Sequence, residues 1–357
     1  MTPAIPSSTP NIVEPKQVWQ GLRDQKPDIR ARDALALLGV GEARLVASTC
    51  GHAATRLAGH WAALIEALPS LGRVAVLTRN DHAVHEQVGE YRNIRIVGDQ
   101  GVVLGEGIDL RLCLRHWHYG FAVHADPQSG ATESLQFFDG AGTAVHKIYL
   151  TRRSDRRAYA NLVNVHRSSD QSPRQADWAK LSAPPSRLDE DIDVEGLRRH
   201  WRALRDAHDF RDMLRRFGVS RMQGLRLAGM DLAWPVETTV APMLLDSAAE
   251  LLLDLMVSVA SPGVVQIHSG AVNKLHLTGP WLNVLDRDFK LHLRQGAVAS
   301  AWVVTKPTVH GPVTSLELYD SAGNAITLFH GKRKPGQAEN PVWRALVTAL
   351  PTVATQS

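Results

Sequence analysis

One histidine in this 357-residue sequence stands where its ring could bind a metal or take part in catalysis. His208 lies within residues 191–218, whose pattern predicts a single helix. Leu197, Trp201, Leu204 and His208 follow one another at spacings of four, three and four residues, so their side chains should share one face. Such a histidine is either a core residue with satisfied ring nitrogens or a ligand or catalytic group. The spacing alone leaves both interpretations open.

Charged residues frame this predicted helix. A helix dipole favours negative charge at its start, and acidic residues gather there: Asp189, Glu190, Asp191 and Asp193. Arg215 and Arg216, followed by Gly218, are typical of a helix end with a left-handed cap.

The remaining histidines and the two cysteines do not form a recognisable metal motif. Cys50 and Cys113 form neither CxxC nor CxxCH, so the sequence predicts neither a zinc knuckle nor covalent haem attachment. No histidine pair forms HExxH. Alternative ligands are still offered by His82, His85, His116, His118, His268 and His310.

Composition indicates a globular protein of two or three domains, since 44% of residues are hydrophobic and 21% are charged. The net charge is +4, and most of the basic residues are arginines. Arginine suits carboxylates and phosphates, so we expect an anionic ligand. No basic run is dense enough to indicate nucleic acid, although residues 29–49 could form a helix-turn-helix.

Targeting signals are not evident. Residues 1–16 are rich in Pro, Ser and Thr, and we expect a disordered tail there rather than a secretory signal. The most apolar stretch, residues 243–260, contains Asp246, Glu250 and Asp254 and is a poor membrane span. We therefore expect a cytoplasmic protein with reduced thiols.

The sequence is internally duplicated. Leu110 and Leu112 match Leu291 and Leu293 at an offset of 181 residues (291 − 110 = 181). The same offset relates Gly89 to Gly270, Gly98 to Gly279, and the hairpin residues Ser134, Leu135, Asp139, Ala141, Gly142 and Ala144 to Ser315, Leu316, Asp320, Ala322, Gly323 and Ala325. A constant offset over this length indicates structural duplication.

The pattern predicts an α+β fold in tandem repeat, each half being a large antiparallel sheet flanked by helices. Helices are expected at 17–23, 29–49 and 61–68, the last stopped by Pro69, and strands begin at residue 73. The expected divisions are a tail (1–16), an N-terminal repeat (17–166), a linker (167–190), a C-terminal repeat (191–351) and a second tail (352–357). At the upstream offset of 179 residues, the counterpart of His208 is Ile29. Because the histidine occurs in only one copy of the repeat, the ligand interpretation is favoured over a purely structural one.

Several long motifs give the chain a family resemblance. They include LTRNDHAVHEQVGEY, DLRLCLRHWHYGFAV and ESLQFFDGAGTAVHKIYL in the first half. In the second half they include DAHDFRDMLRRFGVSR, TGPWLNVLDRDFKLHL and GKRKPGQ. From about Trp19 to Leu350 the chain resembles the HemS/HmuS family of cytoplasmic haem-handling proteins, called hemin-degrading factors or hemin transport proteins. The resemblance implies a tandem repeat that holds one haem b between a sheet and helices.

The resemblance also implies two residues on either side of the haem iron. His208 matches the proximal ligand, and a neutral imidazole is a good iron ligand. Arg111 matches the distal arginine, which holds a bound molecule rather than iron because it stays protonated. Leu110 and Leu112 should take one face of their strand and Arg111 the other, together with Asp109 and Cys113.

Further positions match residues around the haem propionates. Buried carboxylates need cationic partners, and the resemblance supplies Arg221, Lys306 and Arg333, with Met256 as an apolar wall. Three residues depart from the family pattern: Cys113 replaces an aromatic residue, and Leu328 and His330 replace glutamine and tyrosine. His330 could keep a propionate hydrogen bond.

The resemblance implies a function in bacterial iron acquisition, in which the protein binds haem. It would receive the haem from an importer and deliver it onward, with a haem oxygenase as a possible acceptor. The alternative is a haem-degrading enzyme in which Arg111 acts on the distal side. No GxGxxG precedes a helix, so its electrons would come from an external donor. A weaker alternative is a haem-responsive DNA-binding regulator using residues 29–49.

Overall fold

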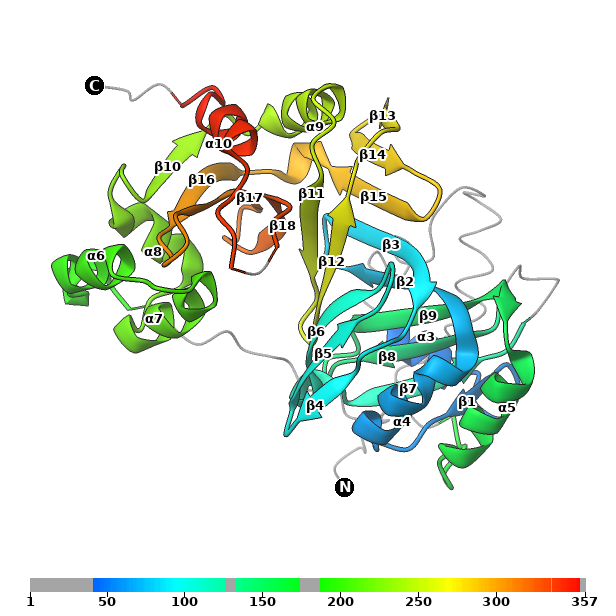
Figure 1. Cartoon of the computed structure of the whole chain (residues 1–357). Coiled ribbons are helices and arrows are strands. Elements are labelled where there is room, and N and C mark those ends of the chain that lie inside the picture. Colours follow the sequence, from blue (N-terminus) through cyan, green and yellow to red (C-terminus); the bar gives the residue numbers. More distant parts are fainter. Residues whose placement is uncertain (1–40, 126–131, 174–186, 335, 354–357) are drawn as a thin grey trace, which may run out of the picture.

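The computed structural model describes residues 41–125, 132–173, 187–334 and 336–353 (Figure 1). The expected tail at 1–16, the helix at 17–23 and the first part of the helix-turn-helix at 29–40 lie outside these residues. Most of the expected linker, 174–186, does so too.

The first half contains three helices and nine strands among the described residues. The helices are α3 (Glu42–Ala47), α4 (Trp61–Ala67) and α5 (Arg156–Val165). The strands are β1 (Ala54–Arg56), β2 (Gly72–Arg79), β3 (Ala83–Glu90), β4 (Arg95–Val97), β5 (Gln100–Leu104), β6 (Asp109–Cys113), β7 (Tyr119–Val123), β8 (Ser134–Phe138) and β9 (Ala144–Ser154). The helix α4 ends before Pro69 as predicted.

The second half opens with three described helices and then repeats the order of the elements from β1 onward. The preceding helices are α6 (Val194–Arg202), α7 (Phe210–Phe217) and α8 (Arg221–Ala228). The repeated elements are β10 (Ala233–Val236), α9 (Val240–Glu250), β11 (Leu255–Ala260), β12 (Val264–Gly270), β13 (Leu275–Thr278), β14 (Trp281–Leu285), β15 (Phe289–Arg294), β16 (Ser300–Lys306), β17 (Val313–Tyr319), β18 (Ala325–Gly331) and α10 (Pro341–Thr348). The predicted α+β duplication is therefore confirmed.

The matched hairpin turns show how closely the halves agree. Oδ1 of Asp139 accepts hydrogen bonds from the backbone of Ala141 and Thr143 at 2.9 and 2.8 Å. Oδ1 of Asp320 accepts the equivalent pair at the same two distances. Gly142 follows with a φ of 80°, which only glycine adopts without strain.

The two sheets exchange strands between the halves, a feature that the sequence did not reveal. Within the described residues each sheet has nine antiparallel strands, in the orders β1-β7-β8-β9-β2-β3-β15-β14-β13 and β10-β16-β17-β18-β11-β12-β6-β5-β4. The strands β4–β6 of the first half thus extend the second sheet through β12, and β13–β15 extend the first sheet through β3 (Figure 1). Each half supplies six strands to one sheet and three to the other.

The helices α6, α7 and α8 form a layer against the second sheet (Figure 1). Its core contains Trp201 and Phe210, whose rings meet edge to face with centroids 4.5 Å apart. Tyr319 and Val304 of the sheet belong to the same buried cluster. The burial of these side chains holds the segment between α6 and α7 over the sheet.

The prediction of one helix over residues 191–218 is wrong. The segment forms α6 and α7, with the 3-10 turn Ala207–Asp209 between them. Asp206 is extended, and its side chain accepts from the backbone of His208, which competes with helical hydrogen bonding. The expected ends are partly right, since Gly218 is a left-handed cap and Asp193 caps the start of α6.

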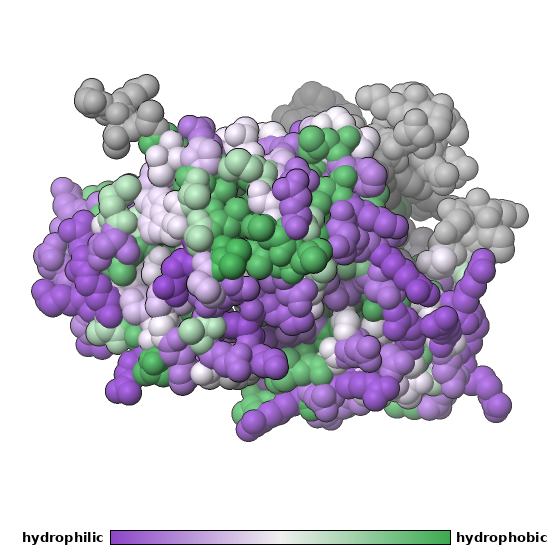
Figure 2. All heavy atoms as spheres, turned by 45° about the horizontal axis from the view of Figure 1, so that its top comes forward, coloured by the Kyte–Doolittle hydropathy of each residue, from purple (hydrophilic) through white to green (hydrophobic). Residues whose placement is uncertain are grey.

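A group of apolar side chains lies on the surface formed by α9, α10 and their neighbours (Figure 2). Met243, Leu251 and Val342 are all exposed there. The expected poor membrane span at 243–260 is split between α9 and β11. Within the described part of the chain, every helix is too short or too polar to cross a bilayer.

Candidate functional site

A cavity of about 300 Å³ brings together four of the predicted site residues. Arg111, His208, Met256 and Arg333 all line it. Arg111 comes from β6, Met256 from β11, and His208 from the turn between α6 and α7. The cavity is therefore bounded by the second sheet and by the connection within the helical layer.

His208 is exposed, with 83% of its side chain accessible. Its Nδ1 lies 2.7 Å from Oδ1 of Asp206, and its Nε2 has no partner among the described residues. The hydrogen bonds from His208, backbone first and ring second, lower the pKa of the Asp206 carboxyl. The interpretation of His208 as a core residue is therefore wrong. Its role as a ligand remains a prediction.

Arg111 reaches this cavity because of the strand exchange. The strand β6 belongs to the first half but pairs with β12 of the second, with Arg111 opposite Val265. The side chain pairs with Asp109 and also donates to the Leu110 carbonyl at 3.2 Å. The predicted alternation is correct, since Leu110 and Leu112 are buried on the other face.

Arg221 and Lys306 surround a buried carboxylate that the sequence interpretation missed. Glu317 on β17 is fully buried, and its Oε2 lies 2.8 Å from Nε of Arg221. Lys306 Nζ donates to Oε1 at 3.1 Å, and the Tyr319 hydroxyl donates to Oε2 at 2.5 Å. Burial acts to raise the pKa of Glu317, but the charges of Arg221 and Lys306 outweigh it and hold the pKa well below its usual value. In the sequence, the signal for this cluster was a single carboxylate within the otherwise uncharged strand VTSLELY, which is buried.

Phe210 connects this cluster with the cavity. The Arg221 guanidinium and the Lys306 ammonium lie 5.1 and 5.0 Å from the Phe210 ring centroid. Phe210 follows His208 by two residues and is buried. The structure thus groups Arg221 and Lys306 behind Phe210, and neither lines the cavity that holds His208.

His330 and Leu328 lie beside this cluster on β18. His330 is paired in register with Met256, and Leu328 with Glu317. Burial, together with the smaller effect of the Lys306 charge, lowers the pKa of His330 to about 3. The ring is therefore neutral near neutral pH, and it does not line the His208 cavity.

Arginines supply the cationic side of the cavity. Arg333 lines it and lies 3.5 Å from the Gln337 carbonyl. Arg205 lines it too, although the sequence interpretation did not single it out among the many arginines of residues 198–216. Cys113 lies in a neighbouring cavity of about 260 Å³, which Arg111 and Arg211 also line.

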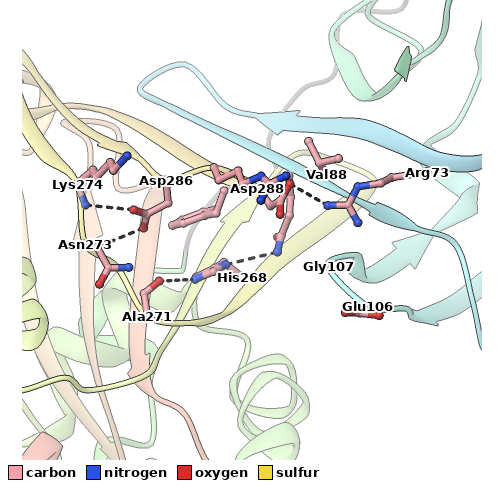
Figure 3. A pocket seen from close by; sticks show the side chains of 13 residues that line it. Arg73, Val88, Glu106, Gly107, His268, Ala271, Asn273, Lys274, Asp286 and Asp288 are labelled. Carbon is pink, nitrogen blue, oxygen red and sulfur yellow. Dashed lines mark hydrogen bonds and ion pairs between the residues drawn. The ribbon is translucent and has the colours of Figure 1, made fainter. Parts of the chain in front are cut away.

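Of the alternative histidine ligands, only His310 lines this cavity. His268 lies in a separate cavity of about 650 Å³ (Figure 3). Its Nδ1 is 3.4 Å from Gln87, its Nε2 is 3.1 Å from the Ala271 carbonyl, and its ring stacks on Phe289. Both ring nitrogens are occupied, so His268 is structural. Among the described residues, no cluster of three His, Cys, Asp or Glu side chains could hold a metal ion.

Comparison with known proteins agrees with the duplicated fold. The family described as "Haemin-degrading HemS.ChuX domain" matches residues 39–166 and 218–350. The chain belongs to the HemS family. Each half of the sequence carries one match, as the offset of 181 residues indicated.

Two members of the HemS family illustrate the similarity in sequence. The hemin transport protein HemS of Yersinia enterocolitica is 37% identical over 329 residues, which cover 91% of this chain and 93% of the relative. The hemin transport protein HmuS of Yersinia pestis is 37% identical over 339 residues, covering 94% and 96%.

Solved structures extend the agreement to the whole fold. Holo-PhuS, a heme-binding protein from Pseudomonas aeruginosa, matches with a TM-score of 0.91 at 41% identity, covering 96% of this chain and 100% of that chain. The heme degrading enzyme ChuS of Escherichia coli O157:H7 matches with a TM-score of 0.88 at 33% identity, covering 94% and 98%. The strand exchange is therefore part of a fold shared along nearly the full chain.

Proposed function

We propose that this protein binds one haem b in the cavity at His208, with Nε2 of His208 as the axial ligand to iron. The observation that carries the proposal is the exposed imidazole whose Nε2 has no partner in the described chain and whose cavity also holds Arg111. Relatives at 37 to 41% identity are named as hemin transport or heme-binding proteins. These names support haem as the ligand.

The lining residues fit a haem in their chemistry. Met256 supplies an apolar contact, and Arg205 and Arg333 supply positive charge for carboxylates. We propose Arg221, Lys306 and His330 as further propionate contacts, which would require a propionate to reach past Phe210, since none of the three lines this cavity. Because Glu317 occupies Arg221 and Lys306, a propionate would have to share them with this carboxylate.

In the role we propose, the protein works in the cytoplasm of a bacterium that uses haem as an iron source. It receives haem from an importer and delivers it onward, with a haem oxygenase as one acceptor. An exposed ligand residue on a short turn between two helices suits both loading and release, since it is not enclosed by the core.

A second candidate is haem degradation, which the similarity to ChuS favours, since ChuS is described as a heme oxygenase and a heme degrading enzyme. Bound haem would supply oxygen-activating iron, given electrons from an external donor. Arg111, which lines the same cavity as His208, would donate hydrogen bonds to a molecule bound there, because its guanidinium stays protonated. Met256 would exclude water from one wall of the cavity.

A haem titration followed in the Soret region tests the binding proposal. We expect wild type to bind one haem, and His208→Ala to bind about 10-fold more weakly or more, or with a changed spectrum. His310→Ala is the matched control, since His310 is exposed and lines the same cavity. Equal behaviour of wild type and His208→Ala would contradict the proposal.

The same samples separate delivery from degradation. The haem-bound protein receives a reductant under air, with catalase present. Decay of the Soret band with release of iron and a ring-opened product would show degradation. Intact haem that disappears only after an acceptor oxygenase is added would show delivery.

A further inference from the structure

We propose that Asp206 is a positioning residue that sets the ring tautomer and the donor strength of His208. This inference rests on the proposed function, because it concerns the same ligand. It goes further by assigning a role to the carboxylate behind that ligand and by specifying which form of iron it favours.

One oxygen of Asp206 makes two contacts with His208. Oδ1 accepts from the His208 backbone N–H at 2.8 Å and from ring Nδ1 at 2.7 Å. The first contact fixes the turn, and the second fixes the ring relative to that turn. Together they place the proton on Nδ1 and leave the Nε2 lone pair free toward the cavity.

A carboxylate behind the imidazole also changes the ring's electronic character. A hydrogen bond to an anion increases the basicity of the opposite ring nitrogen, as carboxylate–histidine pairs do in other metal sites. A more basic nitrogen donates more strongly to iron and stabilises the ferric state over the ferrous state. We therefore infer that His208 is tuned toward holding ferric haem.

The chain offers a substitution that separates the charge of this carboxylate from its hydrogen bonds. Asp206→Asn keeps an oxygen that can accept from the His208 backbone N–H, but it removes the negative charge. The matched control is Asp209→Asn, which removes a neighbouring exposed carboxylate of the same turn that does not cap α7 with its side chain. Circular dichroism and thermal unfolding check that both variants remain folded.

The first measurement uses the protein without haem, so it does not depend on the proposed function. Nitrogen NMR of the histidine rings reports which nitrogen carries the proton. We expect the Nδ1–H form for His208 in wild type and in Asp209→Asn, and a shift toward the Nε2–H form in Asp206→Asn. An unchanged tautomer in Asp206→Asn would overturn the proposal.

The second measurement uses the haem-bound protein. In Asp206→Asn we expect a lower iron–histidine stretching frequency in the ferrous state and about a 10-fold smaller preference for ferric over ferrous haem, which corresponds to a midpoint potential higher by about 59 mV. If Asp206→Asn had the wild-type stretching frequency and midpoint potential, the role of Asp206 would be overturned, but the proposed function would not. Equal haem binding by wild type and His208→Ala in the titration above would instead overturn the proposed function.

Discussion

Arg111 and His208 line the same cavity although they come from different halves of a duplicated chain. Arg111 reaches this position because β6 leaves its own half and pairs with β12. His208 reaches it because residues 203–209 interrupt the helical segment between α6 and α7. The candidate site is therefore built by the strand exchange and by one local break, and neither half of the sequence contains it alone.

Arg111→Ala tests the distal assignment. We expect haem binding through His208 to persist within about 10-fold, because Arg111 does not ligate iron. The spectrum of the ferric form should change, and any degradation under reductant should slow by about 100-fold, as when one preorganised donor is removed. Soret titration and single-turnover decay measure both effects.

Arg111→Lys is the control for the charge, since it can keep an ion pair with Asp109 but lacks the planar fork. It should bind haem as wild type does. If Arg111→Ala had the wild-type spectrum and decay rate, the distal role of Arg111 would be contradicted.

Glu317→Gln should destabilise the protein by about 3 kcal/mol, because it leaves two cations near Phe210 without their shared carboxylate. Urea unfolding at neutral pH measures the free energy. The matched control is Glu195→Gln, which breaks an exposed pair with Arg198 and should change stability by less than about 1 kcal/mol. Equal effects of the two substitutions would show that the buried cluster contributes no more than a surface pair.

Acid should destabilise the fold through the buried histidine His146. Its ring lies 2.9 Å from the Thr78 hydroxyl and 2.7 Å from the Tyr91 hydroxyl, and burial lowers its pKa from 6.5 to about 3. The unfolded state therefore takes up the proton first as pH falls. Stability from this neutral ring is complete above pH 6.5 and is lost progressively down to about pH 3.

Urea unfolding of wild type and His146→Gln between pH 6 and pH 4 measures this contribution. Glutamine keeps hydrogen-bonding groups but does not titrate. The loss of stability per pH unit should be smaller in the variant by about 1.4 kcal/mol, the value for one proton. Parallel curves for the two proteins would contradict a neutral buried His146.

The isolated first half, residues 41–173, should form a homodimer rather than a folded monomer. Removing the second half leaves the edges of β3 and β6 without their partners β15 and β12. Because β15 is the counterpart of β6 in the duplication, a second copy of the half can supply the missing strand. Light scattering after gel filtration measures the mass. A stable, well-folded monomer would contradict this expectation, and with it the importance of the exchanged pairing.

Sequence reasoning succeeded where structure depends on local or repeated signals. The turns at Asp139 and Asp320 could be matched because each carboxylate bonds to its own next few residues. The helix over His208 was wrong because Asp206 bonds locally to the backbone, which a pattern of apolar spacing ignores. The grouping of Arg221 and Lys306 around Glu317 depends on tertiary pairing between α8 and two strands. Spacing along the chain carries no record of that contact, nor of the pairing between β6 and β12.

The exchanged strands also have a consequence for folding during synthesis. The strand β6 leaves the ribosome long before β12, its partner, has been made. Until then the nascent first half carries the unpaired edges of β3 and β6, and open edges invite pairing with other chains. Contacts between segments so distant in sequence form slowly. Folding of this protein can therefore be completed only after its second half has been synthesised. A delay in translating the second half would expose the chain to aggregation.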